Sequence, residues 1–73
     1  MTLDDMLDDS ITLQGRIIVT SWWDNEKHTL YDGDGESLPD EYGKPFMGWD
    51  VTFIFPSKLD EDTIFIELER KLV

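Results

Sequence analysis

The sequence predicts an α+β protein in which a four-stranded antiparallel sheet, or a small open barrel, carries a short N-terminal helix. Two observations lead to this fold class. Apolar and polar residues alternate along two long stretches, one after residue 11 and one after residue 49, as in strands with one buried face. Before residue 8 the apolar spacing is helical instead. A chain of 73 residues has room for one core, so residues 1–73 are expected to form a single domain.

Thr2 and Asp5 predict the start of the helix. They match a capping box in which Asp replaces the more usual Glu. Leu3, Met6 and Leu7 then fall at i, i+3 and i+4, which predicts the apolar side of one short amphipathic helix.

The first hairpin is predicted from residues 11–23, a long strand in which Gly15 is a bulge or a bend. A polar turn over 24–27 returns the chain through a second strand at 28–31. Residues 32–37 have the composition of a loop, because paired glycines supply positive φ. Pro39 then opens a helical turn that Gly43 and Pro45 end.

The second hairpin is predicted from strands at 49–55 and 64–69, with Pro56 ending the first of them. The alternation assigns ten residues to the inner face of the sheet: Leu13, Ile17, Val19, Trp49, Val51, Phe53, Phe55, Ile64, Ile66 and Leu68.

The opposite face carries Ile18, Trp22, Ile54 and Phe65, where a solvated sheet would show polar side chains. Two interpretations remain open. In one, the N-terminal helix covers part of this face. In the other, the four residues form an exposed apolar interface that pairs two copies or binds a partner.

The charge is the strongest functional signal, with 17 acidic residues against six basic ones and a net charge of −11. A domain this negative repels nucleic acid and anionic membranes and attracts cationic grooves. Because 40% of the chain is apolar, we expect a folded domain rather than a disordered acidic tail. The candidate partner-binding acids form three clusters: Asp4, Asp5, Asp8 and Asp9; Asp32, Asp34, Glu36, Asp40 and Glu41; and Asp60, Glu61 and Asp62.

Catalytic and metal chemistry find little support in the sequence. The chain has no cysteine, which removes thiolate sites and favours a reducing cytoplasm. His28 is the only histidine, so a zinc site of ordinary composition is not expected. A calcium loop over residues 30–41 would begin at Leu30, where a carboxylate is required. We therefore expect no enzyme, cofactor or metal, and no membrane span either, since none of the apolar runs reaches roughly 18 residues.

Several short segments resemble small acidic proteins of phages and mobile elements of Gram-positive bacteria. The segments are Thr2-Leu3-Asp4-Asp5, Ile11-Thr12-Leu13-Gln14-Gly15, Leu38-Pro39-Asp40-Glu41-Tyr42, Trp49-Asp50-Val51, Phe55-Pro56 and the final Ile-Phe-Ile-Glu-Leu. The resemblance brings no catalytic motif. It implies a context in which small acidic proteins include inhibitors of host nucleases, some of them similar to DNA in their display of charge.

Two functional hypotheses follow. The first is a non-enzymatic inhibitor that mimics nucleic acid and occupies the cationic groove of a nucleic-acid-binding protein, without binding nucleic acid itself. The second is an interaction module that forms homodimers or larger assemblies through Ile18, Trp22, Ile54 and Phe65, its acidity serving solubility. A mimic is expected to gather carboxylates on one surface, whereas a solubilising surface scatters them among the basic groups.

Overall fold

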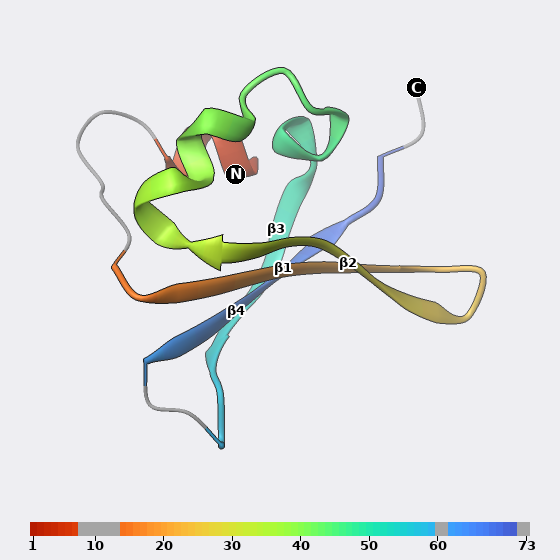
Figure 1. The fold of residues 1–73 in the computed structure, drawn as a ribbon. Helices are drawn as coiled ribbons and strands as arrows, with labels where there is room; N and C mark the ends of the chain where they lie inside the picture. The colour runs from red at the N-terminus through yellow and green to blue at the C-terminus, as the bar shows by residue number, and fades with distance from the viewer. Residues whose placement is uncertain (8–13, 60–61, 72–73) are drawn as a thin grey trace.

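The computed structural model describes residues 1–7, 14–59 and 62–71. Its sheet has the strand order β2-β1-β4-β3 (Figure 1). The elements are α1 (Leu3–Met6), β1 (Arg16–Trp23), β2 (Glu26–Asp34), the 3₁₀ helices η1 (Gly35–Glu41) and η2 (Pro45–Gly48), β3 (Asp50–Pro56) and β4 (Thr63–Glu69). The predicted α+β class, with four strands and a short N-terminal helix, is confirmed. Leu13, Asp8, Asp9, Asp60 and Glu61, which the sequence singled out, lie outside the described residues.

The sheet is mixed rather than antiparallel throughout. The two predicted hairpins, β1 with β2 and β3 with β4, are antiparallel. β1 and β4 lie side by side in parallel, with Ile17 opposite Ile64 and Val19 opposite Ile66. This corrects the prediction, because the chain crosses from β2 at one edge to β3 at the other and so brings β4 beside β1 in the same direction. The sheet is open, with β2 and β3 as its edges.

α1 begins with the predicted capping box. The backbone N–H of Asp5 donates to Thr2 Oγ1, and the N–H of Thr2 donates to Asp5 Oδ2, both at 3.2 Å. Leu3, Met6 and Leu7 are buried as predicted. None of the helices in the described part of the chain is long and apolar enough to cross a membrane.

The core lies between one face of the sheet and the layer formed by α1, η1 and η2 (Figure 1). The strands contribute Ile17, Val19, Ile66 and Leu68, and the helical layer contributes Leu3, Met6, Leu7, Leu38, Phe46 and Met47. α1 therefore covers the face that was assigned to the core, and the interpretation that it covers the opposite face is wrong. We call that opposite face, which no helix of the described residues covers, the open face.

The first hairpin turns more tightly than predicted. Trp23 is paired with Glu26, and Asp24 and Asn25 between them have φ of 54° and 63°, as in the two-residue turns that match strand twist. β2 then continues to Asp34, so residues 32–34, predicted as a loop, belong to a strand.

The inner-face assignment of β3 fails after Val51. The register with β4 shifts between Val51 and Phe53, which makes Thr52 the extra residue of a β-bulge. Ile54 lies opposite the buried Ile66, and residues directly opposite each other share a face. Ile54 is therefore on the core side of the sheet, at its edge, and not on the open face as predicted.

The same bulge turns Phe53 and Phe55 to the open face, opposite Glu67 and Phe65. Both rings are exposed rather than buried in the core. The bulge thus exchanges the two faces of β3 and moves two aromatic rings into solvent.

Replacing Phe53 by Ala should consequently change the free energy of unfolding by no more than about 0.5 kcal/mol, as at other exposed positions. The side chain keeps 62% of its surface exposed. Urea denaturation measures the effect, and Ile66→Ala in the core, with an expected loss of about 2–5 kcal/mol, is the control. If Phe53→Ala lowered the free energy of unfolding as much as Ile66→Ala, Phe53 would be buried and the register without the bulge would be correct.

Candidate functional site

Acidic residues of α1 and η1 lie in the helical layer that covers the core. Tyr42, at the end of η1, donates its hydroxyl to the backbone oxygen of Leu7 at the end of α1, over 2.8 Å. This bond places the first and second predicted acidic clusters on neighbouring elements. The carboxylates concerned are Asp4, Asp5, Glu36 and Asp40, all exposed, and the half-buried Glu41.

The pKa of Tyr31 on β2 is affected by the negative charge of the second cluster. The Tyr31 hydroxyl donates to the backbone oxygen of Asp34 over 2.6 Å. Burial raises the pKa of Tyr31 above 10.0, and the carboxylates of Asp34, Glu41, Asp40 and Asp32 raise this pKa further, because each disfavours the phenolate. The four carboxylates therefore lie close enough together to act on one phenol.

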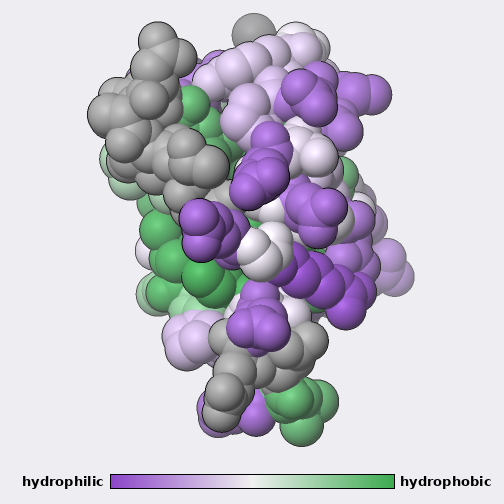
Figure 2. Space-filling view, turned by 60° about the vertical axis from the view of Figure 1, so that its left-hand side comes forward, coloured by the Kyte–Doolittle hydropathy of each residue, from purple (hydrophilic) through white to green (hydrophobic). Residues whose placement is uncertain are grey.

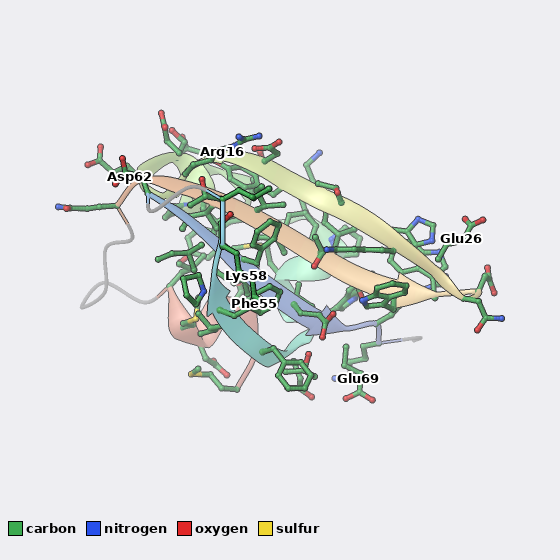
Figure 3. All side chains as sticks on the ribbon, turned by 90° about the horizontal axis from the view of Figure 1, so that it is seen from below. Arg16, Glu26, Phe55, Lys58, Asp62 and Glu69 are labelled. Carbon is green, nitrogen blue, oxygen red and sulfur yellow. The ribbon has the colours of Figure 1, made fainter. Side chains whose placement is uncertain are left out.

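Asp62, the described member of the third cluster, lies near the beginning of η1 at one end of the sheet. Gly15 accepts the backbone N–H of Gly35 over 2.9 Å, and the N–H of Arg16 donates to the backbone oxygen of Asp62 over 3.0 Å. These bonds place Asp62 at the sheet end where η1 begins. Asp62 is labelled beside Arg16 in Figure 3, and Glu26 and Glu69 are labelled at the far end. We use the name acidic surface for one set of residues: Asp4, Asp5, Glu36, Asp40, Glu41 and Asp62.

Asp32 and Asp34, although part of the second predicted cluster, are not part of this surface. Asp32 lies opposite Ile18 and Asp34 opposite Arg16, so both belong to the open face. The guanidinium of Arg16 donates to both carboxylate oxygens of Asp32, each over 2.8 Å. These hydrogen bonds and the positive charge hold the pKa of Asp32 below its usual value, so the carboxylate stays ionised and paired.

Two further cations, Lys27 and Arg70, contact aromatic rings of the sheet. Lys27 lies 5.2 Å from the centre of the Phe65 ring, and the guanidinium of Arg70 lies 4.8 Å from the ring of Trp23. Residues 1–7 and 35–49, which form the helical layer, contain one basic side chain, Lys44, against five acids. In the view of Figure 2, hydrophilic residues gather at the centre and right, and hydrophobic residues gather at the left and again at the lower right.

The open face is aromatic. Trp22 exposes 53% of its surface and donates its indole N–H to Glu67 Oε1 over 2.7 Å. Phe55 stacks on Phe65 with ring centres 5.3 Å apart. Ile18 on β1 is half-buried beside them. Of the predicted apolar interface, the structure therefore places Ile18, Trp22 and Phe65 on the open face and moves Ile54 to the edge.

Two shallow grooves border this aromatic face. One of about 520 Å³ lies between Trp22, Phe53 and Arg70. The other, of about 460 Å³, lies between Lys27, Phe55 and Lys58. Phe55 and Lys58 are labelled near each other in Figure 3. Each groove combines an aromatic wall with a cation.

A further aromatic cluster, which the sequence did not reveal, closes the other end of the core. The rings of Trp23 and His28 stack with centres 3.6 Å apart, and Trp49 meets Trp23 edge-on at 5.9 Å. His28 is half-buried there, and its Nε2 has no hydrogen-bond partner among the described residues. The two-residue turn at Asp24 and Asn25 is the feature of the sequence from which this cluster could have been predicted. It brings Trp23 and His28 to the same face of neighbouring strands.

The groups considered for catalysis or metal binding do not converge in the described residues. His28 could act as a base only for a nearby hydroxyl; Ser21, the serine opposite it, is fully buried and donates its hydroxyl to the backbone oxygen of Leu68 over 2.7 Å. Leu30 and Asp32 belong to β2, and residues 35–41 form η1, so residues 30–41 do not have the form of a single calcium-binding loop. Within residues 1–7, 14–59 and 62–71, histidines and carboxylates form no group of three or more that could hold a metal ion.

No protein-family model matches the chain, and the searches of curated proteins and of solved structures found no match.

Proposed function

We propose that this protein is a non-enzymatic binding protein whose acidic surface occupies a cationic groove on another protein, in the manner of a nucleic-acid mimic. A phage-type inhibitor of a host nucleic-acid-binding protein is the form of this function that the resemblance favours. The observation that carries the proposal is the gathering of acids in the helical layer, where Lys44 is the one basic side chain against five acids. Acids dominate α1 and η1, whereas Arg16, Lys27 and Arg70 are engaged on the sheet.

Local contacts hold the carboxylates of this surface in place before any partner arrives. The capping box fixes Asp5, and the bond from Tyr42 to Leu7 ties η1 to α1. Leu38 anchors η1 in the core with no exposed surface. A preorganised set of charges loses less entropy on binding than a flexible acidic tail would, which favours affinity.

Binding of this kind should respond to salt and to competitors. Exposed charges are screened over about 8–10 Å at physiological ionic strength, so added salt should weaken the complex. Duplex DNA should displace the protein, because both ligands would neutralise the same cationic side chains. Catalytic turnover has no part in the proposal.

A pair of charge-reversal variants tests the acidic surface. Glu36→Lys with Asp40→Lys changes two exposed acids of η1, whereas Glu26→Lys with Glu69→Lys changes two exposed acids at the far end of the sheet (Figure 3). Both double variants change the net charge by the same amount. We expect the η1 variant to lose binding to cationic proteins of a host lysate, eluted with salt or with duplex DNA, and the far-end variant to keep it. If both double variants lost binding equally, net charge alone would explain the effect, and the proposal would be overturned.

Self-association is a second candidate function, and one observation favours it. Trp22 and Phe53 each expose more than half of their surface on or beside the uncovered open face, and monomeric proteins seldom expose large contiguous apolar patches. In this case the acidity would serve solubility. Sedimentation over a range of protein concentrations tests it, and a strict monomer throughout would remove it.

A further inference from the structure

β3 is an edge strand with one charged residue, Asp50 at its beginning, in a highly charged protein. Between Asp50 and Lys58 the chain carries no ionisable side chain, and Ile54 exposes 53% of its surface. Edge strands of monomeric proteins are commonly protected by charged side chains, since unpaired backbone groups accept strands of other chains. Here the side chains offer no such protection.

The N-terminal residues already pair with the beginning of this edge. Val51 donates its N–H to the backbone oxygen of Met1 over 2.8 Å, and Leu3 donates its N–H to the oxygen of Trp49 over 3.1 Å. Asp50 forms an antiparallel bridge with Thr2. Within the described residues, the outer edge of β3 beyond this bridge has no partner strand.

The bulge determines which backbone groups the remaining edge offers. Successive residues of a strand direct their N–H and C=O groups alternately to its two sides. Val51 points away from β4, and Thr52 is the extra residue of the bulge. The next outward residue is therefore Ile54, while Phe53 and Phe55 direct their backbone groups to β4. Pro56, the following outward position, has no N–H, so the free edge ends there.

We infer that two copies of this chain pair through the outer edge of β3, antiparallel and centred on Ile54, so that one sheet continues through both copies. The inference rests on self-association, the second candidate function. Around this centre the two Ile54 residues would exchange their N–H and C=O groups, as a hydrogen-bonded pair does. The contact uses the same surface on both copies, so it closes as a two-fold dimer rather than growing into a fibre.

Side chains on both faces suit this register. On the open face Phe53 comes opposite Phe55 of the second copy, and Phe55 opposite its Phe53, so that cross-strand aromatic pairs form. The stacking of Phe55 on Phe65 extends this ring cluster into each copy. On the core side the two Ile54 side chains meet.

The distribution of charge also favours the outer edge of β3 as the dimer interface. Two molecules of net charge −11 repel each other through most of their surfaces, but residues 51–57 of the β3 edge carry none of these charges. The antiparallel arrangement brings Asp50 of one copy toward the end that carries Lys58 of the other, which is attractive. Added salt should strengthen the dimer by screening the remaining repulsion, whereas it should weaken the binding proposed for the acidic surface.

The test compares Ile54→Lys with Leu59→Lys by sedimentation at low and high salt, together with thermal unfolding. Both changes replace an exposed apolar residue by lysine, and Leu59, 99% exposed in the turn after β3, is the matched control. We expect the wild type and Leu59→Lys to dimerise alike, and Ile54→Lys to weaken the dimer about tenfold or more at unchanged melting temperature. A dimer of Ile54→Lys as strong as that of the wild type overturns edge pairing and leaves self-association standing.

Hydrogen exchange of the wild-type protein gives a second measurement that needs no variant. The outward N–H of Ile54 should exchange rapidly in dilute solution and become protected as the concentration rises, while amides paired between β1 and β4 stay protected throughout. A wild type that remains monomeric at every concentration and salt overturns both self-association and edge pairing. A dimer without concentration-dependent protection of Ile54 overturns edge pairing alone.

Discussion

Replacing Leu38 by Ala is expected to lower the free energy of unfolding by about 2–5 kcal/mol, a large share of the stability of so small a domain. Leu38 has no exposed surface and joins η1 to the core. The loss of its side chain leaves a cavity that the short η1 cannot close. Urea denaturation measures the effect, and the acidic surface should lose its binding together with the anchorage of η1.

The control for this change is Leu59→Ala, which removes the same side-chain atoms from a fully solvated position. Its effect on unfolding should be no more than about 0.5 kcal/mol. Equal stabilities of the two variants would contradict the docking of η1 on the sheet.

Replacing Gly15 by Ala is the second change with a large expected effect. Gly15 has φ of +82°, and a Cβ atom there would lie 2.6 Å from the backbone oxygen of Asp62. That oxygen accepts the N–H of Arg16, so it cannot move without loss of a hydrogen bond beside the β1 and β4 strands. The unfavourable φ alone should lower the free energy of unfolding by about 1–3 kcal/mol, and the steric clash should lower it further. Urea denaturation measures the total loss.

Gly48→Ala is the matched control, because a Cβ at Gly48 meets no atom within 4 Å and its φ is not positive. It should leave stability unchanged or raise it by up to about 1 kcal/mol. If Gly15→Ala behaved like Gly48→Ala, the close approach of the chain before β1 to the chain before β4 would be disproved.

The parts of the fold that were predictable are those in which local pattern and tertiary contacts agree. The capping box of Thr2 and Asp5 depends on neighbours three residues apart and is confirmed. The alternation around Ile17 and Val19 in β1, and around Ile66 in β4, identified buried residues correctly. Each of these patterns has apolar residues mainly on one face, so a single register satisfies it.

The assignment of β3 failed because its sequence is apolar on both faces after Val51. Phe53, Ile54 and Phe55 offer the core an apolar side chain in either register, and only the bulge at Thr52 decides between them. Alternation does not reveal a bulge. The parallel pairing of β1 with β4 was equally hidden, since two hairpins can be joined in more than one strand order.

The candidate site was predictable in composition but not in arrangement. The sequence identified the acids of α1 and η1 as separate clusters, and their proximity depends on the bond from Tyr42 to Leu7. The pairing of Asp32 with Arg16 removes one acid from the set. These are contacts between residues far apart in the chain, which depend on topology rather than on local spacing.

The parallel pairing of β1 with β4 also determines the order in which the protein is able to fold. The β1–β2 hairpin forms from neighbouring residues, but its central strand keeps one side unpaired until residues 63–69 have been synthesised. Closing so long a loop is entropically costly, so this step should be the slow one. On the ribosome, the nascent chain would therefore carry β1 with one edge unpaired until residues 63–69 emerge. We expect a chaperone that binds the nascent chain to contact this edge of β1.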